Sequence, residues 1–413
     1  MPCWKNQPWP RDSNETASGR PGAVQSDLDG GLMQDVQKLS ALTGLRFVAA
    51  LMIVLHHLHG VLWIPAGAFA NFALDSGVSF FFVLSGFILH YNYRNRIARL
   101  PWHHFIWMRF WRLWPAHIAA LLFALALSPT WWLNWLPKNL SAGEFLQIVF
   151  LLQSWTPESR VYFAWNGPAW SISTEMAFYA AFPILCFFAA RRPAGLLIAV
   201  GLVVLAHLTI ADAYFYDPDV KGIVRGLSEI NPIPRLLEFA AGVVICETVV
   251  YRQLIKRMPR PTIAEILALL IAALALWAAP TYLPSVTHAI GLPPISSAYA
   301  RLAIFCPAFC LLIAVFSFQG GAVSRFLSTA AMVWLGETSF ALYLVHQPVI
   351  FFIRRHWTEM EVWQQIPLFA ALTLGTSAGV FYFIERPGIR FSRVALGATK
   401  QKTSPNTLSS RQD

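Results

Sequence analysis

The apolar stretch Leu42–Trp63 carries ionisable side chains that could do chemistry inside a membrane. It is long enough to cross a bilayer as a helix, yet it contains Arg46 near one end and His56, His57 and His59 further along. Ionisable residues inside a membrane helix cost free energy and usually face a bundle interior or a wet cavity. The stretch therefore holds candidates for a functional site.

Helical spacing singles out Arg46 and His57 among these residues. They are eleven positions apart, which at about 100° per residue puts them on one helix face, about 16 Å apart along the axis. His56 points about 100° away from His57, and His59 lies about 140° from it. One face would thus present a fixed cation near the membrane edge and a titratable imidazole near the middle.

Two further arginines could bind an anion. Arg109 and Arg112 are three residues apart at the predicted cytoplasmic start of the third span, so they share a helix face. Two guanidinium groups that converge at a membrane edge make a good phosphate clamp. Anchoring by positive charge on the cytoplasmic side explains the same pair equally well, and the spacing alone leaves both interpretations open.

Other polar residues also fall in apolar segments. Glu175 has no cation within one turn, so it needs a partner from another helix or a functional role. Ser339, Tyr343 and His346 are four and three residues apart and form one polar stripe. The segment Ser76–Phe87 is rich in small residues, which allow membrane helices to pack closely.

Composition places these residues in a membrane protein. Of 413 residues, 56% are hydrophobic and only 13% are charged, whereas a soluble globular domain has about a quarter charged residues. The net charge of +10 fits basic loops that orient a membrane protein, because no soluble basic domain is present to bind nucleic acid. Four of the five cysteines lie in apolar runs and adjacent histidines point apart, so we expect no disulfide and no metal site.

The apolar runs predict an all-α integral membrane protein with about ten transmembrane helices. The predicted spans are Leu42–Leu62, Phe72–Asn92, Met108–Ser128, Trp170–Ala190, Ala194–Ala211, Pro232–Tyr251, Ile263–Ala279, Ala298–Phe318, Ala331–Ile353 and Pro367–Glu385. The run Phe145–Gln153 is too short to span and predicts an interfacial or re-entrant piece. Most of the 31 Lys and Arg residues then fall on the side of both termini, which predicts that both termini are cytoplasmic.

Three regions follow from this pattern. Residues 1–38 are polar, show no cleavable signal peptide, and are expected to form a disordered cytoplasmic tail. Residues 39–390 would form the membrane domain, and residues 391–413 a second disordered cytoplasmic tail.

Taken together, the motifs resemble the acyltransferase-3 family of integral membrane O-acyltransferases. The matching elements, in chain order, are Arg46 with His57, Phe81–Phe87, Arg109 with Arg112, Trp170–Glu175, Ser339–Pro348 and the closing Glu385-Arg386-Pro387. The resemblance covers roughly residues 40–390. Two departures are Met176, where the family often has a second Glu, and the absence of a hydrolase-like domain after Arg390. A separate extracytoplasmic partner protein could supply that domain if the pathway requires it.

The resemblance implies transfer of an acyl group, expected to be acetyl, from cytoplasmic acyl-CoA to a hydroxyl of an extracytoplasmic glycan or lipid-linked saccharide. Arg109, Arg112 and Arg46 would then meet the phosphates of CoA. His57 would take the proton of the attacking hydroxyl or accept the acyl group itself. Glu175 would orient the acceptor or tune a histidine. No permanently bound cofactor is expected.

The remaining family positions are expected to line the acyl channel or to contact the acceptor. Ser85, Gly86 and Phe87 would let helices pack around the channel, and Tyr343 and His346 would contact the acceptor or simply pack. The resemblance also suggests a bacterial inner membrane. A transporter, or a non-catalytic partner in polysaccharide export, is the alternative function. A transporter of this size often has paired broken helices, and no such repeat is seen.

Overall fold

A computed structural model describes residues 38–61, 71–127, 140–218, 222–357 and 359–402. Within these residues all regular elements are helical, and no strand is present. Ten helices correspond to the predicted spans: α1 (Ser40–Val61), α2 (Gly77–Tyr93), α3 (Trp102–Leu127), α7 (Ala169–Arg191), α8 (Pro193–Ile210), α10 (Pro232–Cys246), α11 (Pro261–Ala289), α13 (Phe305–Ser317), α15 (Ala330–His356) and α16 (Val362–Val380). The other α-helices are α5 (Ala142–Val149), α6 (Ser159–Tyr162), α9 (Ile223–Arg225), α12 (Pro294–Ala303), α14 (Ala322–Leu327) and α17 (Arg386–Lys402).

Short helical turns of other kinds extend or join these helices. The 3-10 turns are η1 (Leu74–Ser76), η2 (Ile97–Arg99) and η3 (Gln153–Trp155). The π-helical turns are η4 (Ala211–Phe215), η5 (Gly226–Ile230), η6 (Glu247–Tyr251) and η7 (Phe381–Glu385).

The chain is an all-α integral membrane protein. Within the described residues, 8 helical segments are long and apolar enough to cross a membrane. The two remaining predicted spans are also helical, as α10 continued by η6 and as α15. Large apolar side chains such as Ile198, Leu202 and Leu270 are exposed along α8 and α11, which suits contact with lipid rather than with water.

Several boundaries differ from the predicted ones. Helix α3 begins at Trp102, so Arg109 and Arg112 lie well inside it rather than at its start. Helix α11 continues through Pro280 and Pro284 to Ala289, because neighbouring groups in a membrane bundle can compensate for the hydrogen bond that proline removes.

Only part of the two predicted tails lies within the described residues. Residues 391–402 continue helix α17 instead of being disordered. Residues 1–37 and 403–413 of the predicted tails lie outside the described residues.

The short run near Phe145 forms a helix too short to span, α5, as predicted. Ser141 and Glu144 form a capping box at its start. The guanidinium of Arg160 and the backbone of Ser141 lower the pKa of the Glu144 carboxyl to about 2.

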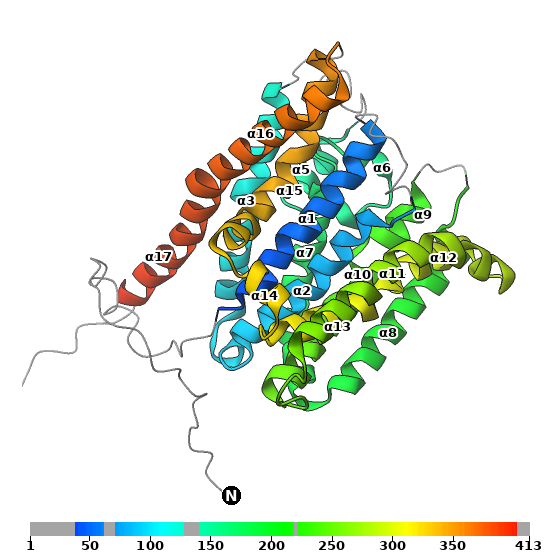
Figure 1. The fold of residues 1–413 in the computed structure, drawn as a ribbon, viewed down its shortest axis with the longest axis vertical. Helices are drawn as coiled ribbons and strands as arrows, with labels where there is room; N and C mark the ends of the chain where they lie inside the picture. Colours follow the sequence, from blue (N-terminus) through cyan, green and yellow to red (C-terminus); the bar gives the residue numbers. More distant parts are fainter. Residues whose placement is uncertain (1–37, 62–70, 128–139, 219–221, 358, 403–413) are drawn as a thin grey trace, which may run out of the picture. The chain divides into compact units, whose positions relative to one another are not determined.

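Two helix pairs form the centre of the bundle, α1 with α15 and α2 with α10 (Figure 1). Small residues allow the close approach. A Cβ atom on Gly336 of α15 would lie 1.9 Å from the carbonyl oxygen of Thr43 in α1, and one on Gly86 of α2 would lie 2.0 Å from that of Phe239 in α10. Glycine at these contacts therefore sets the spacing of the helices that carry the candidate site.

We expect the substitution Gly86→Ala to destabilise the protein, because the added methyl group would overlap backbone that cannot move alone. Overpacking of this kind costs about 1–3 kcal/mol or more. Gly201→Ala in α8 is the matched control, since nothing lies within 4 Å of a Cβ atom there. The melting temperature of each variant in detergent measures its stability. Equal melting temperatures would show that α2 and α10 are not in close contact.

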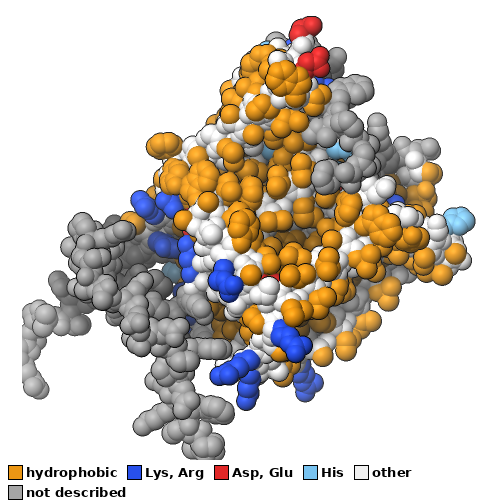
Figure 2. Space-filling model, viewed as in Figure 1, with side chains coloured by type: hydrophobic (Ala, Val, Ile, Leu, Met, Phe, Trp, Pro, Cys, Tyr) orange, Lys and Arg blue, Asp and Glu red, His pale blue; other side chains and the backbone are white. Residues whose placement is uncertain are grey.

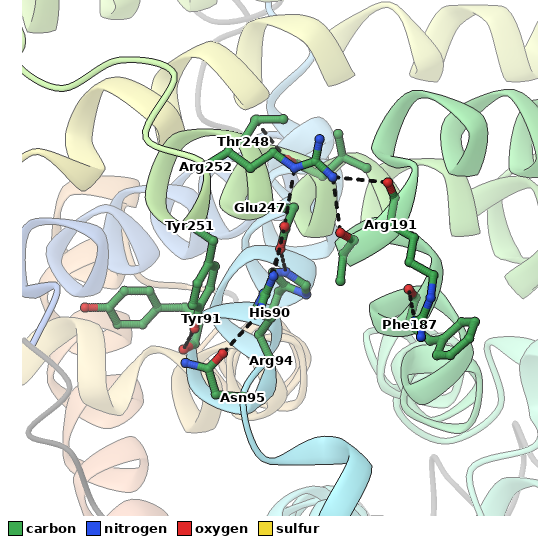
Figure 3. Close-up of polar contacts among 12 residues, drawn as sticks. His90, Tyr91, Arg94, Asn95, Phe187, Arg191, Glu247, Thr248, Tyr251 and Arg252 are labelled. Carbon is green, nitrogen blue, oxygen red and sulfur yellow. Dashed lines mark hydrogen bonds and ion pairs between the residues drawn. The ribbon is translucent and has the colours of Figure 1, made fainter. Parts of the chain in front are cut away.

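A buried carboxylate ties three helices together at the end of the bundle where α2 finishes (Figure 3). Glu247 is 1% exposed and accepts hydrogen bonds from His90 Nε2 at 2.8 Å, Arg94 Nε at 3.0 Å and Arg252 Nε at 3.4 Å. Arg252 also donates from Nη2 to the carbonyl oxygens of Ala190 and Arg191 at the end of α7. One acid thus balances two arginines and fixes α2 and α10 to the last turn of α7.

The substitution Glu247→Gln should lower the free energy of unfolding by about 3 kcal/mol, because it leaves Arg94 and Arg252 without their shared counter-charge. The control is Glu158→Gln, which breaks an exposed ion pair with Arg160 and should change stability by less than about 1 kcal/mol. Thermal unfolding of both variants in the same detergent makes the comparison. A Glu247→Gln protein as stable as the control would exclude this role.

Candidate active site

A cavity of about 350 Å³ opens among α1, α2, α3, α7, α15 and α17. Its most prominent feature is positive charge. Five arginines line it: Arg46, Arg96, Arg109, Arg112 and Arg393. Glu175 is the one acidic side chain among the described residues that line it. The cavity therefore suits an anionic ligand with several charges.

The arginines of the cavity are positioned by aromatic and acidic neighbours. Arg109 donates from Nη2 to the hydroxyl of Tyr93 at 2.5 Å, and its guanidinium carbon lies 4.8 Å from the centre of that ring. Arg46 and Arg112 are close enough to interact electrostatically with each other and with the buried Glu385. Like charges held together in this way favour the binding of a counter-ion between them.

Glu175 belongs to this cavity. Its Oε1 atom accepts a hydrogen bond from Ser85 Oγ at 2.7 Å and another from the hydroxyl of Tyr179 at 2.5 Å. Ser85 and Glu175 come from α2 and α7, so the partner that the sequence required is supplied by another helix. These bonds place Glu175 in the same cavity as the arginines, and its predicted role toward the acceptor or a histidine stays a prediction.

His57 pairs with His346 across the contact between α1 and α15. His57 Nδ1 lies 2.9 Å from the carbonyl oxygen of Ile53 and 3.2 Å from His346 Nε2. His346 is fully buried, and its Nδ1 lies 2.7 Å from the carbonyl oxygen of Tyr343. Helix packing thus joins two histidines that are 289 residues apart in the sequence.

These contacts fix the tautomers of both neutral rings. A carbonyl oxygen only accepts, so His346 Nδ1 carries the proton that it donates to Tyr343, and His346 Nε2 is left as an acceptor. His57 Nδ1 then faces two acceptors, Ile53 and His346, and must carry a proton itself. The unprotonated nitrogen of His57 is Nε2, for which the described residues supply no hydrogen bond. His57 Nε2 is therefore available to accept a proton as a base.

Tyr343 connects the histidine pair to the cavity. Its ring lines the cavity, and its centre lies 5.9 Å from that of His346 and 6.3 Å from that of Phe81. The Tyr343 hydroxyl bonds with Ser171 Oγ at 2.8 Å and donates to the carbonyl oxygen of Pro168 at 3.0 Å. The histidines thus lie directly behind the cavity wall formed by Phe81 and Tyr343.

The structure places the predicted site residues in three groups. Arg46, Ser85, Arg109, Arg112, Glu175 and Tyr343 line the cavity. His57 and His346 form the adjoining pair. Gly86 and Phe87 do not line the cavity. Gly86 packs against the backbone of α10, and the buried Phe87 stacks on Tyr91, because successive helix positions face different directions.

Sequence reasoning missed several residues of the cavity, notably Tyr93, Arg96, Tyr179 and Arg393. Arg96 lies in a basic segment that was interpreted only as a determinant of orientation. Arg393 lies in a segment expected to be disordered. The sequence offered one sign that Arg96 could belong to the cavity, namely that it is basic and lies at the same membrane edge as Arg109.

Comparisons with known proteins agree with this geometry. A family model described as an acyltransferase domain matches residues 39–385. The acyltransferase MdmB of Streptomyces mycarofaciens is 29% identical over 342 residues, covering 76% of this chain and 80% of the relative. The exopolysaccharide production protein ExoZ of Rhizobium meliloti is 28% identical over 327 residues, covering 77% and 90%.

A longer relative is the O-acetyltransferase OatA of Staphylococcus aureus, 24% identical over 387 residues, which cover 86% of this chain and 58% of OatA. No solved structure gives a significant match. The family model covers most of the chain, including every predicted site residue. The chain therefore belongs to the acyltransferase-3 family and is a multi-pass membrane enzyme that transfers acyl groups other than aminoacyl groups.

Proposed function

We propose that this enzyme is an O-acyltransferase that moves an acyl group, acetyl in the first instance, from cytoplasmic acyl-CoA to a hydroxyl of an extracytoplasmic glycan or lipid-linked saccharide. The observation that carries the proposal is the five-arginine cavity directly beside a histidine with a free ring nitrogen. Two relatives are named as an O-acetyltransferase and as an exopolysaccharide production protein, which supports a saccharide as acceptor.

Charge supports acyl-CoA as the donor. CoA carries several phosphate charges, and guanidinium groups bind phosphate oxygens through strong, charge-assisted hydrogen bonds. Arg46, Arg109 and Arg112 reach the cavity from two different helices. Phosphates held among them would leave the thioester end of the donor free to extend along α1 toward His57, about 16 Å further along that helix.

Charge also supports an orientation with both termini in the cytoplasm, and the family suggests a bacterial inner membrane as the location. Lys and Arg side chains gather in the lower and left part of the view in Figure 2, and the surface above them is mainly hydrophobic. Basic residues concentrate on the cytoplasmic side of membrane proteins. Arg94, Arg96 and Arg99 follow α2 at the end of the bundle that holds the arginine cavity.

His57 would act as the general base. The acceptor hydroxyl transfers its proton to His57 Nε2 while its oxygen forms a bond to the acyl carbon. The carbon–sulfur bond of the thioester then breaks, and the CoA thiolate takes up the proton from His57 as the thiol. His346 keeps the His57 ring in the required tautomer, since its Nε2 accepts from His57 Nδ1. An acyl-histidine relay through the same Nε2 atom would leave acylated enzyme when the acceptor is withheld.

The test uses the full chain in proteoliposomes that enclose polysaccharide extracted from cells lacking its gene. Acetyl-CoA labelled on the acyl carbon is added outside, and label in the enclosed polysaccharide is measured. Transfer that requires the protein supports the proposal. Acetyl-CoA binding without transfer, or movement of saccharide across the membrane without acylation, would favour the transporter instead.

A further inference from the structure

A second cavity, of about 370 Å³, lies at a different place in the fold and shares no lining residue with the arginine cavity. Its polar wall consists of Tyr216, Asp217, Arg225, Glu229 and Arg301. These residues come from the end of η4, from α9 with η5, and from α12, and α9 and α12 lie against each other (Figure 1). The volume is within the usual range for small-molecule pockets.

The second cavity and the histidine pair lie near the same segment of chain. The guanidinium carbon of Arg225 lies 5.1 Å from the centre of the Phe163 ring, and Asn166 donates to the carbonyl oxygen of Leu344, two residues before His346. Tyr343 lines the arginine cavity. On α1, Arg46 lines the arginine cavity and His57 lies about 16 Å further along the helix. His346 contacts His57, so α15 connects the neighbourhood of the second cavity with His57.

The second cavity has a balanced charge, in contrast to the first. Arg225 and Arg301 are offset by Asp217 and Glu229, and Arg225 is paired with Glu229 at 2.9 Å. A polyanion gains little in such a site, whereas a neutral ligand with many hydroxyl groups can both donate to the acids and accept from the arginines. Tyr216 adds an amphipathic ring that can pack on the apolar face of a sugar.

Hydrogen bonds hold the walls of this cavity in place. Tyr162 donates its hydroxyl to the carbonyl oxygen of Gly222 at 3.0 Å, at the start of α9. Asp212 accepts from the backbone nitrogens of Ile295 and Ser296, at 2.8 and 3.0 Å, at the start of α12. The bond from Tyr162 fixes the segment that carries Arg225, and the bonds to Asp212 fix the helix that carries Arg301. The cavity is therefore formed before a ligand binds.

We infer that the second cavity binds the acyl acceptor as a neutral saccharide segment and presents one of its hydroxyl groups to His57. The inference rests on the proposed function for the identity of the reaction, but the binding site is argued from the residues of the cavity alone. Arg301 and Tyr216 would determine which acceptor is used, whereas the arginine cavity would determine which donor is used.

The decisive variants are Arg301→Gln and Tyr216→Ala. Arg301 is exposed and makes no hydrogen bond or ion pair with a residue that the structure describes, so its replacement should leave the fold intact. Arg325→Gln on α14 is the matched control, since Arg325 is also exposed and lies outside both cavities. The probe is the polysaccharide from cells lacking the gene, with acetyl-CoA as donor.

Two readouts separate the inference from the proposed function. The first is the polysaccharide concentration that gives half-maximal transfer, which we expect to rise about tenfold in Arg301→Gln and Tyr216→Ala, since each loses a strong polar or stacking contact. The dissociation constant of acetyl-CoA should stay as in the wild type. The second readout is binding of the polysaccharide to the purified full chain in nanodiscs, by saturation-transfer NMR, which needs no reaction.

The outcomes are distinct. Loss of polysaccharide binding in both variants but not in Arg325→Gln supports the second cavity as the acceptor site, even if the wild type transfers no acyl group and the proposed function fails. Unchanged polysaccharide binding in both variants overturns the inference, even if the wild type transfers acyl groups efficiently. A weakened acetyl-CoA affinity with unchanged polysaccharide binding would assign the cavity to the donor and also overturn it.

Discussion

Replacing His57 with alanine should lower the rate of acyl transfer by about 10²–10⁴-fold, the range typical for the loss of a positioned general base. The imidazole is held by Ile53 and His346 with Nε2 left free. The affinity for acetyl-CoA should hardly change, because the arginine cavity does not include His57. Initial rates in proteoliposomes and equilibrium binding of acetyl-CoA measure the two quantities.

The neighbouring His56 provides the matched control. It is exposed on α1 and its ring centre lies 5.3 Å from that of His57, so His56→Ala removes the same side chain one position away. This control should keep most of the activity. Equal losses in the two variants would point to a disturbed helix instead of a lost base. Full activity in His57→Ala would remove His57 from the mechanism and leave the family assignment unaffected.

Replacing Arg112 with glutamine should weaken acetyl-CoA binding by about 10- to 100-fold, the equivalent of one or two charge-assisted hydrogen bonds. Arg112 lines the cavity beside Arg46, with which it interacts electrostatically. The turnover at saturating donor should fall much less than in His57→Ala, because in the proposed function Arg112 would bind phosphate and would take no part in proton transfer. Isothermal titration with acetyl-CoA at two salt concentrations gives the dissociation constant and shows how much of the binding free energy depends on charge.

Arg99→Gln is the control for this prediction. Arg99 is exposed in η2 at the same end of the bundle but does not line the cavity. A general effect of positive charge on the anionic donor would weaken binding in both variants alike. A specific clamp weakens it in Arg112→Gln only. Wild-type affinity in Arg112→Gln would mean that the arginine pair serves to anchor the helix, the other interpretation of the Arg109/Arg112 spacing.

The two predictions separate binding from chemistry. Arg112→Gln is expected to lose affinity for acetyl-CoA and keep its turnover, whereas His57→Ala is expected to keep its affinity and lose turnover. This result would divide the site into a donor clamp and a reaction centre. The reverse pattern, with turnover lost at Arg112, would require the phosphates to sit close to the reacting atoms.

Local properties of the sequence were enough to identify the class of protein and several residues of the candidate site. A transmembrane helix is determined by a run of apolar side chains, so helical segments could be located without knowing what lies beside each of them, and 8 of them within the described residues are long and apolar enough to span. Residues on one helix have a fixed relation, which is why Arg46 and His57, or Arg109 and Arg112, could be placed on common faces.

Contacts between helices could not be predicted in this way, because they depend on which face each helix turns to which neighbour. The bond from Ser85 to Glu175 joins residues 90 positions apart, and the pairing of His57 with His346 joins residues 289 apart. Gly86 was expected to let helices pack around the channel, but the sequence could not show that its partner is α10 or that its neighbour Ser85 lines the cavity.

The sequence by itself thus determined a helical membrane acyltransferase with its ionisable residues placed on individual helices. Only the tertiary structure decided that Arg96 and Arg393 join the arginine cavity and that Glu175 lies there too. It also decided that His346 accepts a hydrogen bond from His57. The physical reason is that hydrophobicity acts on each segment separately, whereas charge pairs and hydrogen bonds between helices require atoms of different helices within hydrogen-bond distance.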